Sequence, residues 1–179
     1  MTELELREFV RKVQKMKCEM QTLELKTARE GCPKRLYDTL SSFSNQDMGG
    51  IILFGIDEKE DYKIAGVYDM QDLQKKVNEQ CKQMVPMVRP VFTSVLIDDK
   101  SVVSAEIPGI DITERPCYYG GVGRTKGSYV RAGDSDEPMS DYEIYSYEAF
   151  RKKYQDDIRI NERADMSTID TEKLDDYVG

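Results

Sequence analysis

A pair of glycines followed by an unbroken apolar run is the feature that most constrains how this sequence can fold. Gly49 and Gly50 lead directly into residues 51–54, which read Ile-Ile-Leu-Phe. A continuous apolar run of this length is typical of a β-strand that is buried on both faces. The glycines before it tolerate the positive φ that the end of a helix needs. The pattern therefore predicts a helix, a turn and a buried strand, in that order.

Helical and strand patterns alternate along the rest of the chain. Apolar residues at helical spacing predict helices at residues 3–17, 33–44, 69–84 and 140–155. Shorter runs predict strands at residues 22–26, 51–54, 64–67, 91–97, 101–107 and 128–131, and residues 108–127 form a long loop. Two of these strands are joined at residues 98–100 as a hairpin. We therefore expect an α/β (α+β) fold, a mixed β-sheet that contains a hairpin and is flanked by about four helices.

The acidic charge of the chain is concentrated at its C-terminal end. The formal net charge is −8, and residues 134–179 hold 14 acidic and 6 basic residues, whereas residues 1–133 hold 20 of each. After about residue 156 the helical pattern fades into a polar, acidic segment. We therefore expect a domain at residues 1–155 and, at residues 156–179, an acidic linker toward a missing C-terminal region. A body without net charge can still carry a basic face.

Residue types and patterns that the sequence lacks exclude several kinds of catalysis and indicate where the protein is located. The sequence contains no histidine, which excludes Ser–His–Asp and Cys–His catalysis and the usual zinc sites. No apolar run approaches the roughly 18 residues that a membrane span needs, and the first residues lack a secretory pattern. We therefore expect a cytoplasmic protein with no membrane partner. Its cysteines are expected to be free thiols: Cys18, Cys32, Cys81 and Cys117.

Four sequence blocks, taken in order, resemble the motifs of the Schlafen AlbA_2 family. They read TLELK at residues 22–26, LSSFSN with GGIILFGID at residues 40–57, IAGV at residues 64–67 and SYVRAGDS at residues 128–135. The agreement extends over roughly residues 15–150. Leu25 stands where the family usually has an aromatic residue, and Met48 adds a residue before the glycine pair. A loop insertion of that kind costs little.

The resemblance implies the fold of this family and a role as the N-terminal DNA-binding module of a bacterial transcriptional regulator. In such proteins a divergent ATPase-like region commonly follows. Related modules occur as paired lobes, which implies a homodimer.

Seven cationic side chains are candidates for contacting nucleic acid, because phosphates are bound by cations gathered on one face. They are Lys26, Arg29, Lys34, Arg35, Arg124, Lys126 and Arg131. The alternative is that they are ordinary solvated charges. Arg131 lies inside a predicted strand, so it either reaches the site or pairs with an acid such as Asp57 or Glu24. Tyr118 and Tyr119 could stack on bases, but we favour packing on the core as loop anchors.

Three carboxylates form a second candidate site, for a metal-dependent nuclease. Glu19 and Glu24 lie five residues apart, and Asp57 follows the buried strand. Carboxylates at strand ends can hold Mg²⁺ or Mn²⁺ and activate water. Some eukaryotic relatives in the Schlafen family are RNases with three acids at matching positions, so the resemblance implies catalytic and metal-binding roles for these residues. The alternative is that Glu24 pairs with Lys26 or Arg131, while Glu19 is simply on the surface.

We favour a nucleic-acid-binding module, with DNA as the partner, over an enzyme, and expect it to need no cofactor. Binding of this kind contributes affinity rather than fine sequence readout, because no basic recognition helix is evident. Two alternatives remain open. One is a metal-dependent endoribonuclease that uses Mg²⁺ or Mn²⁺, and the other is a protein-interaction or dimerisation module whose basic residues are incidental.

Overall fold

The predicted buried strand lies inside a four-stranded mixed sheet. A computed structural model describes the backbone of residues 1–178 and the side chains of residues 1–164. The sheet has the order β1 (Leu23–Lys26), β2 (Gly50–Phe54), β7 (Lys100–Ile107) and β6 (Val91–Ile97). β1 runs parallel to β2, and β7 is antiparallel to both β2 and β6. The expected mixed α/β fold with its hairpin is confirmed.

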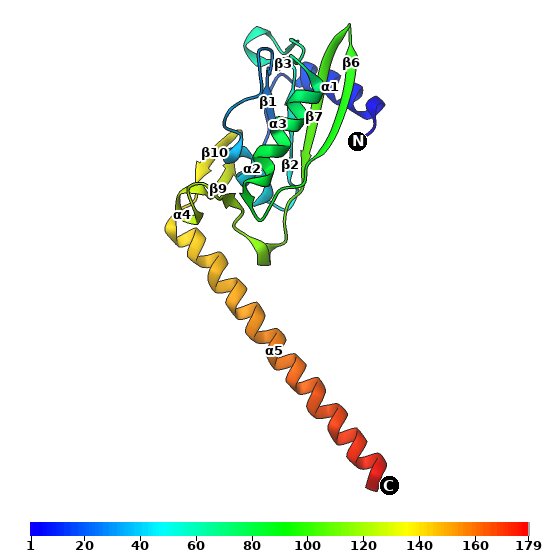
Figure 1. Cartoon of the computed structure of the whole chain (residues 1–179), viewed down its shortest axis with the longest axis vertical. Helices are drawn as coiled ribbons and strands as arrows, with labels where there is room; N and C mark the ends of the chain where they lie inside the picture. The colour runs from blue at the N-terminus through cyan, green and yellow to red at the C-terminus, as the bar shows by residue number, and fades with distance from the viewer. Residues whose placement is uncertain (179) are drawn as a thin grey trace.

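Alternate side chains of β2 enter two separate apolar cores. Ile52 and Phe54 pack with residues of α2 (Tyr37–Ser44) and α3 (Met70–Lys82) on one face of the sheet. Leu53 packs on the other face with α1 (Glu3–Met16), which crosses over β6 (Figure 1). Because successive side chains of a strand point to opposite faces, a strand between two helical layers has to be apolar throughout.

Short elements complete the body, and one long helix leaves it (Figure 1). The short pairs are β3 (Ile56–Asp57) with β4 (Lys63–Ile64), β5 (Met84–Val85) with β8 (Tyr118–Tyr119), and β9 (Tyr129–Ala132) with β10 (Ser135–Pro138). The remaining elements are the 3₁₀ turns η1 (Glu58–Glu60) and η2 (Ile112–Glu114), and the helices α4 (Arg124–Gly127) and α5 (Asp141–Val178). No described helix combines the length and the apolar character that crossing a membrane requires.

The second helix begins later than the sequence pattern predicts. The prediction placed Pro33 at its first position, but α2 starts at Tyr37. The side chain of Gln80 on α3 holds the preceding segment in another shape. Its amide donates to the Pro33 carbonyl at 2.7 Å, and its oxygen accepts from the Leu36 N–H at 2.8 Å. The Pro33 carbonyl and the Leu36 N–H therefore have partners on the Gln80 side chain and do not need those of a helix.

Four other boundaries differ from the predictions. α3 ends at Lys82, so Met84 lies in β5 instead of the helix. The strand expected at residues 64–67 is shorter and begins one residue earlier, as β4 at Lys63–Ile64. The predicted loop at residues 108–127 contains η2, β8 and α4. The capping box of Ser140 and Glu143 is confirmed, since Ser140 Oγ accepts from the Glu143 N–H at 3.2 Å. The helix that follows it continues to Val178, through the segment expected to be a linker.

Gly49 offers a direct test of how the glycine pair sets the turn before β2. Its φ is +62°, and a Cβ there would lie 2.1 Å from the Ile107 carbonyl oxygen. We expect Gly49→Ala to lower the free energy of unfolding by at least about 2 kcal/mol. Gly31→Ala is the control, because a Cβ at Gly31 meets nothing within 4 Å. Equal stabilities of the two variants in urea denaturation would contradict this account.

Candidate nucleic-acid interface

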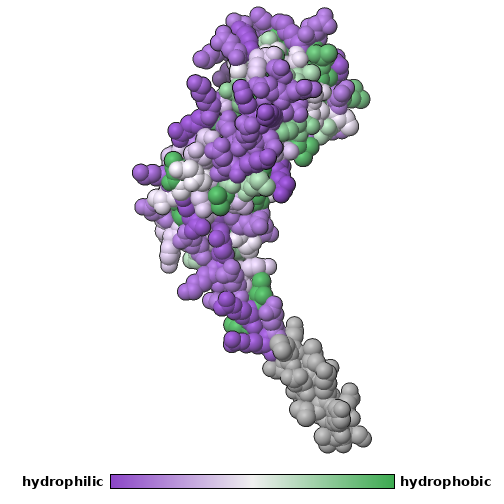
Figure 2. All heavy atoms as spheres, viewed as in Figure 1, coloured by the Kyte–Doolittle hydropathy of each residue, from purple (hydrophilic) through white to green (hydrophobic). Residues whose placement is uncertain are grey.

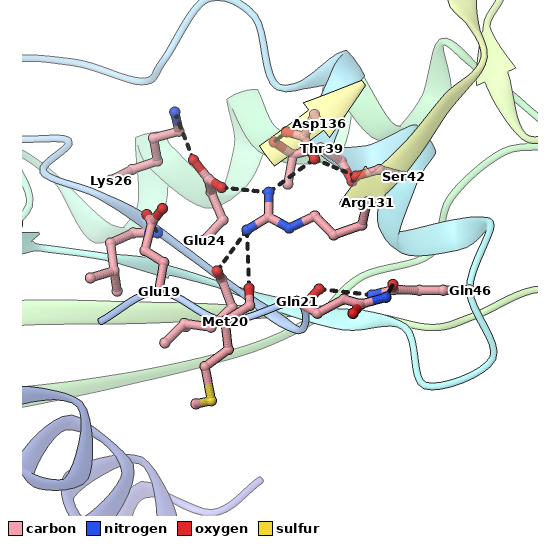
Figure 3. A network of polar contacts seen from close by, with 12 residues as sticks. Glu19, Met20, Gln21, Glu24, Lys26, Thr39, Ser42, Gln46, Arg131 and Asp136 are labelled. Carbon is pink, nitrogen blue, oxygen red and sulfur yellow. Dashed lines mark hydrogen bonds and ion pairs between the residues drawn. The ribbon is translucent and has the colours of Figure 1, made fainter. Parts of the chain in front are cut away.

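Arg131 is the centre of a buried polar network that joins three parts of the fold (Figure 3). Its side chain has no exposed surface. Nη1 donates to Glu24 of β1 at 2.8 Å and to Asp136 of β10 at 2.9 Å, and Nη2 donates to the carbonyls of Met20 and Leu23. The guanidinium carbon lies 5.0 Å from the centre of the Phe43 ring on α2. Arg131 is therefore held by the protein itself and is not presented to a phosphate.

Asp136 extends this network into α2. Its carboxylate accepts from the hydroxyl of Thr39 at 2.6 Å and from that of Ser42. Desolvation alone would lower the pKa of Arg131, but its hydrogen bonds with Glu24 and Asp136 outweigh that effect and raise the pKa. The guanidinium therefore stays charged, and its bonds to the two carboxylates fix the β9–β10 hairpin against β1 and α2. Of the two pairings proposed from sequence for Arg131, the one with Glu24 is present.

The three carboxylates of the candidate nuclease site have separate partners. Glu24 also lies 3.3 Å from the Lys26 ammonium. Asp57 caps η1 by accepting from the Lys59 N–H at 3.0 Å, and it lies 3.6 Å from Arg29. Within the described part of the chain, no three His, Cys, Asp or Glu side chains gather closely enough to hold a metal ion.

Glu19 is a partly buried carboxylate with a raised pKa. Its carboxylate accepts from the Leu25 N–H at 2.8 Å. Burial raises its pKa to about 7; the Leu25 bond opposes this rise, and the nearby charges of Glu24 and Glu58 add to it. Near neutral pH the side chain is therefore protonated in a large share of molecules, which weakens it as a metal ligand.

Three of the seven predicted cations surround one cavity between α2 and α4. Lys34, Arg35 and Lys126 are exposed and line a cavity of about 240 Å³. Its other walls include the rings of three tyrosines: Tyr37, Tyr119 and Tyr129. Asp38 is the only acid in the lining, and it lies 3.2 Å from Arg35. Cations around an aromatic wall suit a ligand that carries both phosphates and planar rings.

The remaining cations lie apart from this cavity. Lys26 and Arg29 line a separate, open depression of about 520 Å³ together with Asp57. Arg124 is paired with Glu148 of α5 at 2.7 Å, and its guanidinium lies 5.5 Å from the centre of the Tyr118 ring. Lys26, Arg29 and Arg124 are therefore partly neutralised by neighbouring carboxylates.

Sequence reasoning did not foresee the contacts that position the tyrosines of the cavity wall. Tyr119 is stacked on Tyr37 with ring centres 3.7 Å apart, so it packs on the protein as expected, but its partner was not foreseen. The sequence gives Asn45 no role beyond its place in the motif at residues 40–57. Its side chain donates to the carbonyls of Cys117 and Tyr129 and accepts from the Cys117 N–H. This amide joins the end of α2 to β9 and so positions Tyr129 in the cavity wall.

These features define a small α/β module. It has a mixed sheet between two helical layers, a hairpin that carries a buried arginine, and an adjoining basic cavity. Residues 19–140 match the family described as Schlafen, AlbA_2. The match spans most of the chain, and the chain therefore belongs to this family.

Two solved structures are similar to this chain, and the first of them shares its fold. One is the N-terminal domain of a protein from Nitrosomonas europaea, described as related to the ATP-dependent DNA helicase RecG; it is 24% identical, with 74% of this chain and 92% of that chain covered and a TM-score of 0.57. The DIP2311 protein from Corynebacterium diphtheriae is 18% identical, with 71% of this chain and 23% of that chain covered and a TM-score of 0.49. No curated protein matches the chain.

Replacing Arg131 tests the role of the buried network. Arg131→Met would remove the cation of Asp136 and leave Glu24 with Lys26 alone, and the Glu24 and Asp136 side chains are only 13% and 15% exposed. We expect the free energy of unfolding to fall by about 3–5 kcal/mol, because the stranded charges are desolvated. Arg89→Met, at an exposed arginine, should change it by less than about 0.5 kcal/mol. A loss of less than about 1 kcal/mol for Arg131→Met would contradict a structural role.

The raised pKa of Glu19 predicts a pH-dependent effect on stability. Because the folded chain holds this proton more tightly than the unfolded chain, stability falls as pH rises from about 4.5 to about 7. Glu19→Gln keeps the oxygen that accepts from Leu25 and removes the charge. We expect its melting temperature to exceed that of the wild type by about 2–4 °C at pH 8 and to equal it at pH 4.

The exposed Glu8 on α1 supplies the control for this pH effect. Glu8→Gln should have the same small effect on the melting temperature at both pH values. A lower melting temperature of Glu19→Gln than of wild type at pH 8 would show that the ionised carboxylate stabilises the fold, contrary to our account.

Proposed function

We propose that this domain binds nucleic acid, with its phosphates on Lys34, Arg35 and Lys126 and its sugars or bases against the tyrosine wall of the same cavity. The observation that carries the proposal is the gathering of these three exposed cations around one aromatic-lined cavity. Each cation that meets a phosphate releases a condensed counterion, so a few contacts supply useful affinity without sequence readout.

The local charge supports this proposal although the chain is acidic overall. The net charge of −8 comes from the segment after residue 133. Charges further away than about 10 Å are largely screened at ordinary salt, so a phosphate at the cavity is governed by the cations beside it. Helix α2 is only eight residues long, and six of them are buried. A major-groove recognition helix is therefore not part of the proposal.

We further propose that DNA is the physiological partner and that the domain is the N-terminal module of a cytoplasmic bacterial transcriptional regulator. This part rests on the family to which the chain belongs. A homodimer and an ATPase-like region after the helix α5 belong to the same proposal. The described N. europaea relative, whose name refers to a DNA helicase, is consistent with a partner of this class.

The nuclease alternative has less support from the geometry. It needs Glu19, Glu24 and Asp57 around one metal ion, but Glu24 is bound to Arg131 and Asp57 caps a 3₁₀ turn. A metal would have to displace a buried arginine that two carboxylates hold. For this reason we favour binding over cleavage.

Removing two cavity cations tests the proposal. We expect the double variant Lys34→Ala/Lys126→Ala to bind labelled duplex DNA at least about tenfold more weakly than the wild type at low salt. The slope of log affinity against log salt should also become shallower by about two, because two phosphate contacts are lost. Fluorescence anisotropy across a salt series measures both quantities.

The matched control removes two exposed lysines from α1, which packs on β6 away from the cavity. Lys12→Ala/Lys15→Ala makes the same change in net charge. It should keep the affinity within about threefold and leave the salt slope unchanged. Equal losses in the two double variants, or no binding by the wild type at low salt, would refute the proposed site.

A further inference from the structure

Helix α5 carries an apolar stripe that nothing in the described structure covers. Phe150, Tyr154 and Ile158 are 42%, 47% and 38% exposed. They are spaced four residues apart, so they lie along one side of the helix. Figure 2 shows hydrophobic side chains that interrupt the otherwise hydrophilic surface of the helix before its grey end. Such a row on a projecting helix is suited to pack against another helix.

The start of α5 is anchored to the body, which leaves this stripe on a fixed support. Ile144 is buried, and Arg151 donates to the carbonyls of Thr113 and Arg115 at 2.7 Å each. Glu148 is paired with Arg124 of α4. The helix therefore leaves the body in a set direction, and the stripe begins at Phe150, beside the last of these contacts.

The charges beside the stripe are arranged with opposite signs on the two sides of Tyr154. Basic residues precede it at positions 151–153, and Asp156 and Asp157 follow it. At 3.6 residues per turn, Lys153 and Asp157 flank the stripe on the same side. Within residues 1–164, neither of these two side chains has an ion-pair partner in its own chain. The surface therefore offers both a cation and an anion to a neighbour.

We propose that two copies of this chain associate through α5, antiparallel, about a twofold axis at Tyr154. In this arrangement Phe150 of one copy lies opposite Ile158 of the other, and Tyr154 meets its own counterpart. Lys153 of each copy then lies within about one helical turn of Asp157 of the second copy. Parallel pairing would instead place the two basic segments side by side and the two acidic segments side by side, which is unfavourable.

The spacing of the stripe also sets how the helices cross. Residues four apart form the ridges that interdigitate in the commonest class of helix packing, with axes inclined by about 50°. Contact is then limited to about two turns on each helix, so the interface is small. We therefore expect a reversible dimer that depends on protein concentration. This inference rests on the homodimer of the proposed function and names its interface. It does not depend on the nucleic-acid site, since none of its residues lines that cavity.

Sedimentation velocity of the full chain, from micromolar to millimolar concentration, measures the association. We expect a monomer–dimer equilibrium that Tyr154→Glu weakens at least about tenfold. Tyr145→Glu is the control, because Tyr145 is exposed on the opposite side of the same helix. Far-UV circular dichroism checks that α5 stays helical in both variants. A chain that stays monomeric throughout, or equal weakening by both variants, would overturn the proposal.

A charge exchange tests the pairing itself. Lys153→Asp and Asp157→Lys should each weaken the dimer by roughly threefold to tenfold, and the double variant Lys153→Asp/Asp157→Lys should restore wild-type association. A double variant that is weaker than either single variant would contradict the pairing.

Cysteine cross-linking tests the antiparallel direction, in a Cys18→Ser background because Cys18 is exposed. Mixed Phe150→Cys and Ile158→Cys chains should form the heterologous disulfide far faster than either chain alone forms a homodimer. Faster cross-linking of each variant with itself would show parallel pairing and overturn the proposal.

Discussion

The fold depends on one buried guanidinium. Arg131 bonds to Glu24 on β1 and to Asp136 on β10, while Asp136 bonds to two hydroxyls of α2. A polar hairpin that could not bury an apolar face of its own is thereby attached to the edge of the sheet. The same hairpin contributes Tyr129 to the basic cavity. The network that stabilises the module therefore also positions its candidate binding surface.

The structure distinguishes charged residues that hold the fold together from those exposed at a candidate binding surface, which the sequence alone does not. Seven cations and three acids are all candidates for a site. In the structure, Arg131 is paired with Glu24, while Glu19 and Asp57 accept hydrogen bonds from backbone N–H groups. Lys34, Arg35 and Lys126 instead remain exposed around a cavity. The acidic charge lies mainly on α5, whose start is attached to the body. A chain with net charge −8 can thus present a basic surface at one place.

The parts of the fold that depend on local patterns could be predicted from the sequence. The apolar run of β2, the hairpin of β6 and β7 and the capping box of α5 follow from periodicity and short-range hydrogen bonds. The start of α2 could not be predicted, because it depends on Gln80, far along the chain. Strand β10 has a polar sequence without strand propensity, and it forms because it pairs with β9 and carries Asp136 to Arg131. Which cations share a face is likewise a tertiary property.

Amide chemical-shift mapping with a short oligonucleotide tests the central claim most directly, because it reports where the ligand lies. Our account predicts that the perturbed amides cluster around the cavity, at Lys34, Arg35, Gly127 and Tyr129, with little change along α1. Perturbations confined to Glu19, Glu24 and Asp57, or to α1, would contradict it, since the ligand would then occupy a surface other than the tyrosine-lined basic cavity.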